Sequence, residues 1–423
     1  MPLDLWTNLQ WRGLVTDSTR PHELHAHLLA GPRAAYVGFD PTADSLHVGS
    51  LLPLLALRRV QLAGHRPIVL IGGGTGLIGD PSGKAGERQL HPEQQVAEAA
   101  VRLKDQVKRF VDFDAGALLV DNYEWLSKLQ VISFLRDIGK HFPLGGMLAK
   151  ESVRSRMGRS DEGISYTEFS YQVLQAYDFM ELLDRHGCTI QLGGSDQWGN
   201  ITAGIELIRR VKGAAAYGVT LPLVTKSDGS KFGKTETGTV WLDEKKTSPY
   251  EMFQFWLNTA DDDVVTYLKY FTFLEPGEID DLQSTTRRWP DRREAQRVLA
   301  RHVTELVHGT GEMEEAEAIS RALFSGDVGA LTEPQLVQAC RAMPRTELAP
   351  GEGAGLPVLE LLSRVGLATS KREGRELVSA GAISINGDRV TNVDAVVTRD
   401  TARFGRFLVI RKGKKSYHAA TLP

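Results

Sequence analysis

The sequence of 423 residues predicts an α/β protein whose last part is a smaller, basic module. In the first 225 residues, short apolar runs with the length of buried strands are followed by longer segments with helical periodicity. Polar and glycine-rich turns follow several of these runs, and open α/β sheets bind ligands at such turns. The two observations predict a ligand-binding α/β domain in this part of the chain.

Composition limits the class of protein. With 42% hydrophobic residues and 18 prolines, the chain is expected to form two or three globular domains. Cys188 and Cys340 are too few for a disulfide framework, which predicts a reducing, cytoplasmic location. The N-terminus lacks the pattern of a signal peptide, and the most apolar segment, residues 48–57, is too short to span a bilayer. We therefore expect no membrane partner.

The charge of −3 is unevenly distributed. Residues 356–423 contain 12 Lys and Arg against 6 Asp and Glu, a net charge of +6, so the first 355 residues carry −9. A basic C-terminal module on an acidic body predicts a polyanionic partner.

The first predicted strand, residues 33–39, leads into the most informative turn of the chain. It follows Gly31-Pro32, and a leucine-rich helix is predicted over residues 50–62. The polar residues between strand and helix are Asp40, Thr42, Asp44, Ser45 and His47. Free backbone N–H groups and the helix dipole favour phosphate at such a turn, and Gly49 beside His47 lets a nucleotide approach the backbone. An ordinary loop between a strand and a helix remains an alternative at this point.

The second predicted strand, residues 67–71, precedes a glycine-rich segment, residues 72–83. Gly74, Gly76 and Gly79 formally match a dinucleotide fingerprint, which requires an acidic residue about 20 positions later at a strand end. The nearest candidate, Glu98, lies in a helix-like run, so nicotinamide binding is rejected. We instead expect backbone here to approach a ligand, with Asp80 directed into the site. Lys84 and Arg88 are predicted on a mobile loop beyond it.

The histidines at positions 22, 25 and 27 are predicted to lie on an ordinary helix face, because no further ligand cluster supports a metal site. After a short strand at residues 118–120, a longer helix is predicted over residues 167–187. Its core stripe consists of Phe169, Val173, Ala176, Met180 and Leu183.

A second, polar line on this helix consists of Tyr171, Gln175 and Asp178. Such a line is often exposed to solvent, but the next segment favours a ligand site. It is a predicted strand, residues 189–192, that bears Gln191 and is followed by Gly193-Gly194-Ser195-Asp196-Gln197-Trp198-Gly199-Asn200 and a helix from Ile201. Paired glycines, an acid and amides at a strand end are typical of ligand binding in an α/β sheet.

A further strand over residues 217–225 leads to Lys231-Phe232-Gly233-Lys234-Thr235, whose two lysines can reach one phosphate group. A solvated surface pair is the alternative. Ser248-Pro249-Tyr250-Glu251 is a capping box that starts a helical region reaching about residue 343. Residues 344–355 read as a linker, residues 370–380 as a basic helix, and Asn386-Gly387 as a hairpin turn.

These motifs resemble those of the bacterial tyrosyl-tRNA synthetases, which are class I aminoacyl-tRNA synthetases, over nearly the full length of the chain. His47-Val48-Gly49-Ser50 is similar to the HIGH motif, residues 231–235 to the KMSKS motif, and residues 193–200 to the stretch after the tyrosine-binding helix. Residues 356–423 resemble the S4 RNA-binding domain. Ser50 replaces the second histidine of HIGH, and Gly233 and Thr235 replace both serines of KMSKS.

The resemblance implies a doubly wound parallel sheet, the Rossmann-like class I core, in residues 1–225. It further implies a KMSKS-like loop and connection at 226–246, an α-helical domain at 247–343, the linker at 344–355 and a small α+β S4-like domain at 356–423. A homodimer that binds tRNA through both subunits is also implied.

The resemblance assigns residues to roles by family motif. The implied tyrosine-binding residues are Tyr36, Asp80, Tyr171, Gln175, Asp178 and Gln191. The implied ATP-binding residues are Gly38, Asp40, His47, Gly49, Ser50, Gly194, Asp196, Gln197 and Lys234. The implied catalytic residues are Thr42, His47, Lys231, Lys234 and Thr235. The implied tRNA-binding residues are Arg209, Arg210, Lys371, Arg372, Arg375, Arg411 and Lys412.

The implied reaction activates L-tyrosine with ATP and transfers it to tRNA(Tyr). It needs no prosthetic group and no protein-bound metal, with ATP as a substrate, accompanied by Mg²⁺. A carboxylate is already a nucleophile, so the reaction requires positioning and cationic stabilisation of the leaving phosphates rather than a Ser, Cys or His base. DNA is not an expected partner.

Two other function classes remain open at this point. Another nucleotidyltransferase with a HIGH-like motif would have no reason to carry the Tyr171, Gln175 and Asp178 line or an S4-like tail. A non-catalytic RNA-binding protein derived from a synthetase would be expected to have lost Lys231 and Lys234, which are both present.

Overall fold

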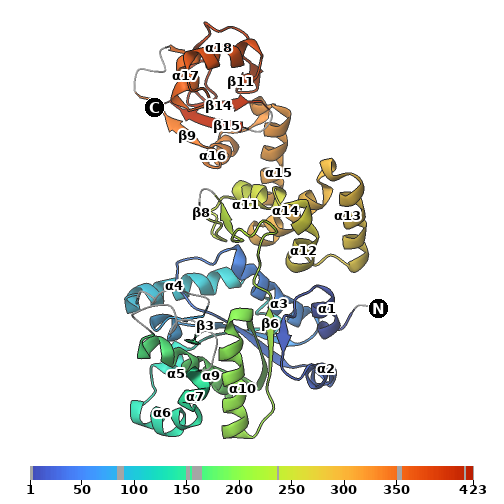
Figure 1. Ribbon diagram of the computed structural model, residues 1–423, viewed down its shortest axis with the longest axis vertical. Coiled ribbons are helices and arrows are strands. Elements are labelled where there is room, and N and C mark those ends of the chain that lie inside the picture. The colour runs from blue at the N-terminus through green and yellow to red at the C-terminus, as the bar shows by residue number, and fades with distance from the viewer. Residues whose placement is uncertain are drawn as a thin grey trace. The chain divides into compact units, whose positions relative to one another are not determined.

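A computed structural model of the chain describes residues 3–82, 90–148, 153–154, 164–235, 238–349, 355–413 and 416–422. The chain forms two compact units, each assembled from two stretches of sequence. The first unit contains residues 1–246 and 260–295, and the second contains residues 247–259 and 296–423. Figure 1 labels many of the helices and strands of both units.

The first unit is built on a six-stranded sheet with the order β1-β6-β5-β2-β3-β4. Its strands are β1 (Asp17–Ser18), β2 (Ala34–Phe39), β3 (Arg66–Ile71), β4 (Leu118–Asp121), β5 (Cys188–Gly194) and β6 (Tyr217–Leu221). All pairings are parallel except that of β1 with β6. The chain runs outward from β2 through β3 to β4 and then returns to β5 on the other side of β2. The expected doubly wound sheet is therefore confirmed, and its switch point, where such sheets bind ligands, lies between β2 and β5.

Helices connect the strands of this sheet. The first seven in chain order are α1 (Leu5–Trp11), α2 (Pro21–Leu29), α3 (Leu51–Leu62), α4 (Glu93–Val107), α5 (Tyr123–Leu126), α6 (Val131–Asp137) and α7 (Leu144–Leu148). Next come α9 (Tyr166–His186) and α10 (Trp198–Lys212), which pack side by side (Figure 1). Ser165 caps the start of α9 and Gly187, at φ 64°, ends it, as its position after the last apolar residue predicts. Val173, Ala176 and Met180 of the predicted stripe are buried in the core.

A small hairpin and two helices complete the first unit. The hairpin consists of β7 (Lys234–Thr235) and β8 (Gly238–Thr239), and the helices are α12 (Asp261–Phe271) and α13 (Pro276–Arg288). The predicted helical region 247–343 is thus divided, because the helix between these parts, α11 (Pro249–Leu257), belongs to the second unit. Ser248 and Glu251 form the predicted capping box at its start.

The second unit combines helices with a five-stranded sheet of order β12-β11-β14-β15-β9. Its further helices are α14 (Glu294–His308, from residue 296), α15 (Thr310–Ser325), α16 (Glu333–Arg341), α17 (Val358–Arg364) and α18 (Lys371–Ser379). Its strands are β9 (Arg345–Glu347), β10 (Leu356–Pro357), β11 (Ile383–Ile385), β12 (Asp388–Arg389), β13 (Val396–Val397), β14 (Phe407–Lys412) and β15 (Ser416–Thr421). Asn386 and Gly387, at φ 52° and 97°, form the predicted hairpin turn between β11 and β12.

One segment differs from its predicted conformation. Residues 345–347 were expected in a linker, but they form β9 and pair in parallel with Ala419–Thr421 of β15. Two charged residues and one threonine give this strand no apolar pattern, and it is held by backbone pairing with β15 and by the Thr346 hydroxyl, which lies 2.9 Å from His418 Nε2. Within the described residues, no helix has the length and apolar character needed to cross a membrane.

Candidate active site

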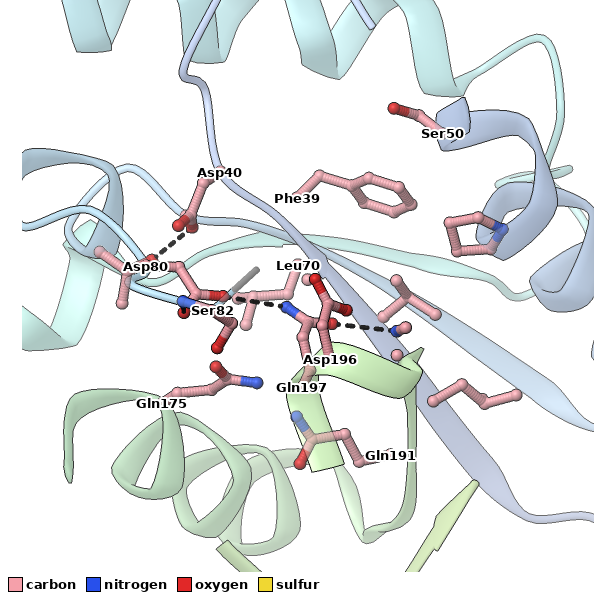
Figure 2. A pocket seen from close by; sticks show the side chains of 18 of the residues that line it. Phe39, Asp40, Ser50, Leu70, Asp80, Ser82, Gln175, Gln191, Asp196 and Gln197 are labelled. Atoms are coloured by element: carbon pink, nitrogen blue, oxygen red, sulfur yellow. Dashed lines mark hydrogen bonds between the residues drawn. The ribbon is translucent and has the colours of Figure 1, made fainter. Parts of the chain in front are cut away.

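A cavity of about 370 Å³ opens at the carboxyl ends of β2, β3 and β5, on both sides of the switch point. The predicted site residues that line it are Tyr36, Gly38, Asp40, Thr42, His47, Gly49, Ser50, Asp80, Tyr171, Gln175, Asp178, Gln191, Gly194, Asp196 and Gln197. The polar line of α9 is therefore buried against the cavity rather than exposed to solvent. Figure 2 shows Gln175 and Gln191 with Asp80 and Gln197, while Ser50 lies apart, at the start of α3.

Two buried polar atoms in the cavity have no hydrogen-bond partner in the described part of the chain. They are the hydroxyl of Tyr36 and Oε1 of Gln191. The Tyr36 ring is held on its other side by Phe179, with 5.3 Å between ring centroids. Because a buried polar group without a partner costs free energy, these atoms are placed to bind a polar ligand.

Asp178 is fully buried and accepts two hydrogen bonds. Asn122 Nδ2 donates to Asp178 Oδ2 at 2.9 Å and Trp125 Nε1 donates to Oδ1 at 2.7 Å. Burial raises the pKa of Asp178 to about 8, although both hydrogen bonds oppose the shift by favouring the carboxylate. The carboxyl group is thus held in one orientation beside Tyr36, the pKa of which burial and the nearby Asp178 raise.

Asp40 connects this group to a second tyrosine. Tyr171 donates its hydroxyl to Asp40 Oδ2 at 2.7 Å, and Thr75 donates to Oδ1 at 2.8 Å. Asn122 Nδ2 also donates to Thr75 Oγ1 at 2.8 Å. A chain of hydrogen bonds therefore runs from Tyr171 to Asp178, and the shared partners orient all of its members.

A second polar group lies around Asp80. The Ser82 N–H donates to Asp80 Oδ1 at 2.9 Å, and Gln197 Nε2 lies 3.4 Å from Oδ2, as Figure 2 shows. Asn200 Nδ2 donates to Gln175 Oε1 at 2.9 Å and lies 3.5 Å from Asp80. Burial and the charge of Asp80 raise the pKa of the neighbouring Asp196 carboxyl. This concentration of acceptors suits a cationic ligand group.

The turn after β2 has the tight backbone that its sequence predicts. The Gly49 N–H donates to Nδ1 of His47 at 3.0 Å. A Cβ at position 49 would lie 2.7 Å from the imidazole ring, so any other residue there would displace the His47 side chain from this position. Thr42 and His47 are exposed at the cavity mouth.

The lysine loop, residues 225–235 with Lys231 and Lys234, is joined to this turn through backbone hydrogen bonds. The Val48 N–H donates to Val240 O at 3.0 Å, and the Val240 N–H donates to Gly233 O at 2.9 Å. Gly233 has φ 76°, and a Cβ there would approach Val48 to 2.9 Å. Glycine, rather than the serine of the KMSKS motif, at position 233 therefore has a conformational reason, because the backbone is left-handed there and a side chain would crowd Val48.

The lysines themselves lie outside the cavity wall. Among the described residues, Lys231 and Lys234 are exposed and do not line it. The side chain of Thr235, like Lys84 and Arg88, falls outside the described part of the chain. The structure thus brings the residues that are predicted to bind tyrosine and ATP together in one cavity. The two lysines lie on a separate loop that is joined to the His47 turn.

Comparison with known proteins identifies the family. Residues 30–325 match the family model "tRNA synthetases class I (W and Y)", and residues 335–420 match "Tyrosine--tRNA ligase SYY-like C-terminal domain". The chain belongs to the class I tRNA synthetases of the W and Y group.

Individual relatives and structures are similar over most of their length. The chain is 53% identical to the tyrosine–tRNA ligase of Geobacillus kaustophilus over 420 residues, covering 98% of this chain and 99% of that protein. It is 51% identical to the tyrosine–tRNA ligase of Desulfitobacterium hafniense (strain Y51) over 426 residues, covering 99% and 100%. The structure of a C-terminally truncated mitochondrial tyrosyl-tRNA synthetase from Aspergillus nidulans matches with a TM-score of 0.70 and 31% identity, covering 76% of this chain and 95% of that one.

Sequence reasoning missed three residues of this synthetase site. Asn122, Trp125 and Thr75 hold Asp178 and Asp40 in place but were not predicted. Asn122 directly follows β4, so its position at a strand end was an available signal. The role of Trp125 had no signal, because an apolar ring on a short helix is expected in the core.

The basic residues predicted to bind tRNA occupy different environments. Arg209 and Arg210 both pair with Glu206, and these pairs lower the pKa of Glu206 to about 2, with the Arg209 hydrogen bond as the largest cause. Arg372 pairs with Glu376 on α18. Lys371 and Arg375 are exposed on the same helix.

The remaining two basic residues lie on β14. Lys412 donates to Leu367 O and to Glu373. Arg411 lies beside Gly326, within the second unit. No group of His, Cys, Asp and Glu within the described residues could hold a metal ion.

Proposed function

We propose that the chain is an ATP-dependent tyrosine–tRNA ligase. In the first step the tyrosine carboxylate attacks the α-phosphorus of ATP, the bond to the β-phosphate oxygen breaks, and pyrophosphate leaves. In the second step a hydroxyl of the terminal adenosine of tRNA(Tyr) attacks the tyrosyl carbonyl carbon, and AMP leaves. The observation that carries the proposal is a cavity with two separate polar groups, one for each polar end of tyrosine.

The phenol end is formed by Tyr36 and Asp178. The Tyr36 hydroxyl is buried and has no hydrogen-bond partner among the described residues, and the Asp178 carboxyl is held by Asn122 and Trp125. A substrate phenol can bond to both, whereas the phenyl ring of phenylalanine would leave the Tyr36 hydroxyl unpaired and would offer Asp178 no further hydrogen bond. Tyrosyl-tRNA synthetases are the standard example of such discrimination, so its direction follows from the family.

The ammonium end is formed by the polar group around Asp80. The Asp80 carboxylate and the Gln175 amide oxygen provide acceptors, and the Tyr171 hydroxyl lines the same part of the cavity. A substrate ammonium has three donors and is attracted by the charge of Asp80. The distance between the two ends selects an amino acid with a long, polar side chain.

ATP is expected along the turn of His47 and Gly49 and at the strand end with Gly194, Asp196 and Gln197. Because Gly49 has no side chain, a nucleotide can lie against its backbone. Lys231 and Lys234 are suited to stabilise charge that develops on the leaving pyrophosphate, with Thr42 and His47 near the γ-phosphate. These roles are proposals that rest on position and on the family motifs.

Mg²⁺ is expected to enter as a complex with ATP. The described residues contain no group of three or more His, Cys, Asp and Glu for a metal, and Mg²⁺ commonly keeps several waters and binds substrate phosphates. The ion would therefore be held mainly by the nucleotide, where it neutralises phosphate charge.

We also propose a homodimer. Val131, Ile132 and Leu135 of α6 and Leu144 of α7 are large apolar residues that are more than 40% exposed. Exposed large apolar residues grouped on consecutive helices are typical of an interface, and the family resemblance makes a second copy of the chain the expected partner.

The test is pyrophosphate exchange into ATP with each of the twenty amino acids. Exchange that depends on tyrosine supports the proposal, and equal exchange with another amino acid would refute it. The same assay separates the alternatives, since an RNA-binding protein without catalysis would show no exchange. Charging of tRNA(Tyr) but not of other tRNAs then tests the second step.

A further inference from the structure

We infer that helix α12 is a positioning element for the loop that carries Lys231 and Lys234, and that Asp263, Tyr267 and Phe271 anchor this loop. The inference rests on the proposed function, because it concerns the same lysines. It adds three residues outside the catalytic motifs. All of them, and the loop, belong to the first compact unit.

Three contacts join one face of α12 to the segment from Thr225 to Phe232. Asp263 Oδ1 accepts the Ser227 N–H at 3.0 Å. The Tyr267 hydroxyl donates to Thr225 O at 3.0 Å. Phe271 stacks on Phe232, with 5.5 Å between ring centroids and an angle of 10° between the planes.

The spacing of these residues shows why one helix can hold a whole loop. Asp263, Tyr267 and Phe271 are four positions apart, so they lie on a single face, one above the other. Tyr267 also packs edge-on against Phe232, at 5.2 Å. Phe232 lies between Lys231 and Gly233, so its two aromatic partners fix the backbone at the centre of the lysine motif.

The far end of α12 is itself fixed by two buried arginines. Arg12 donates to Lys269 O, Thr272 O and Leu274 O at 3.0, 3.1 and 2.7 Å. Arg59 donates to Thr272 O at 2.7 Å, and both side chains are 4% exposed. The last carbonyls of a helix have no partner within it, and a cation there also interacts favourably with the helix dipole.

This arrangement leads to a specific role. Arg12 directly follows α1, and Arg59 lies on α3. Both helices pack in the first unit with the turn of His47, and the two arginines fix α12, which fixes Phe232. The lysines on either side of Phe232 can therefore be held at a constant place relative to the nucleotide turn. Such positioning affects the step in which the lysines act and not the binding of tyrosine.

The test compares two tyrosines of the same helix. Tyr267→Phe removes the donor to Thr225 O and keeps the ring, while Tyr270→Phe removes a hydroxyl for which no hydrogen bond is found within the described residues. Tyr267→Phe should slow single-turnover formation of tyrosyl-adenylate about 2- to 10-fold, the effect of one neutral hydrogen bond. The Kd for tyrosine should stay within twofold, and Tyr270→Phe should change neither quantity.

Asp263 provides an independent variant with a conservative rescue. Asp263→Ala should slow adenylate formation because the Ser227 N–H loses its acceptor. Asp263→Asn retains an acceptor oxygen and should restore most of the rate. Equal loss in both variants would contradict a role in orienting the loop.

The deciding measurement is a double-mutant cycle with the lysines. In a Lys231→Ala, Lys234→Ala background, Tyr267→Phe should no longer slow adenylate formation, because the groups that it positions are gone. The inference would be overturned if Tyr267→Phe slowed adenylate formation by the same factor with and without the two lysines. It would also be overturned if the variant weakened tyrosine binding by as much as it slowed the reaction. Absence of adenylate formation by the unaltered enzyme would instead refute the proposed function.

Discussion

Replacing Tyr36 by Phe should change stability and activity in opposite directions. In the free protein the Tyr36 hydroxyl is buried and has no partner within the described residues. The ring contact with Phe179 remains in the variant. Removing the hydroxyl therefore deletes an unsatisfied group from the folded state and gives up no hydrogen bond.

The expected magnitudes follow from this geometry. An unsatisfied buried polar group costs about 1 to 3 kcal/mol, so the free energy of unfolding should rise by up to about 3 kcal/mol. With tyrosine bound, the variant loses one neutral hydrogen bond, worth about 0.5 to 1.5 kcal/mol. This corresponds to a decrease of about 2- to 12-fold in kcat/KM for tyrosine.

Two assays decide the matter. Urea unfolding of the enzyme without substrates measures the stability change, and pyrophosphate exchange gives kcat/KM for tyrosine and for phenylalanine. The preference for tyrosine should narrow, because phenylalanine no longer leaves a hydroxyl unpaired. A destabilised variant with unchanged preference would mean that the Tyr36 hydroxyl is satisfied elsewhere and does not contact the substrate.

Three further predictions concern other parts of the enzyme. Asp178 has its pKa raised to about 8, so between about pH 4 and pH 8 the folded protein holds a proton that the unfolded chain releases, and stability should fall as pH rises through this range. Asp178→Asn should remove the part of the pH dependence of stability that comes from this carboxyl group, measured by thermal unfolding from pH 5 to pH 9. An unchanged pH dependence would contradict the raised pKa of Asp178. Lys234→Ala should slow single-turnover adenylate formation at least tenfold with little change in tyrosine affinity, and a normal rate would exclude Lys234 from the mechanism. Joint replacement of the exposed Lys371 and Arg375 by Ala should weaken tRNA binding and leave tyrosine activation intact. The slope of the logarithm of the binding constant against the logarithm of the salt concentration should decrease in magnitude by about 1 for each lost phosphate contact.

The sequence predicted the sheet and most of the cavity because both depend on strong local patterns. The apolar runs of β2, β3 and β5 and the glycine-rich turns after them fixed where the strands end. Parallel strands bring those ends together, so residues as distant as Asp40 and Gln191 could be assigned to one site. The family motifs then supplied their roles, which stay predictions.

The remaining features depend on contacts that leave no periodic pattern. β9 joins the sheet through backbone pairing and one side-chain contact, that of Thr346 with His418, and Trp125 differs from a core residue only in the hydrogen bond from its indole nitrogen to Asp178. The division of the helical region between two units reflects long-range packing, such as the bonds of Arg12 and Arg59 to the end of α12. No local sequence signal predicts such partners, which lie more than 200 residues away.

The distribution of satisfied and unsatisfied groups explains how this site can be both rigid and selective. Asp178 and Asp40 have their orientation fixed by Asn122, Trp125, Thr75 and Tyr171 before any ligand binds, so little ordering is needed on binding. The Tyr36 hydroxyl and Gln191 Oε1, on the adjacent strands β2 and β5, have no hydrogen-bond partner in the part of the chain that the structure describes. A ligand that pairs with them removes the free-energy cost of the unsatisfied groups. A ligand that cannot pair with them leaves this cost in place and also forms no hydrogen bond with Asp178. In the proposed function, selectivity for a phenol therefore comes from the unpaired Tyr36 hydroxyl together with Asp178, whose carboxyl group the hydrogen-bonded network holds in one orientation.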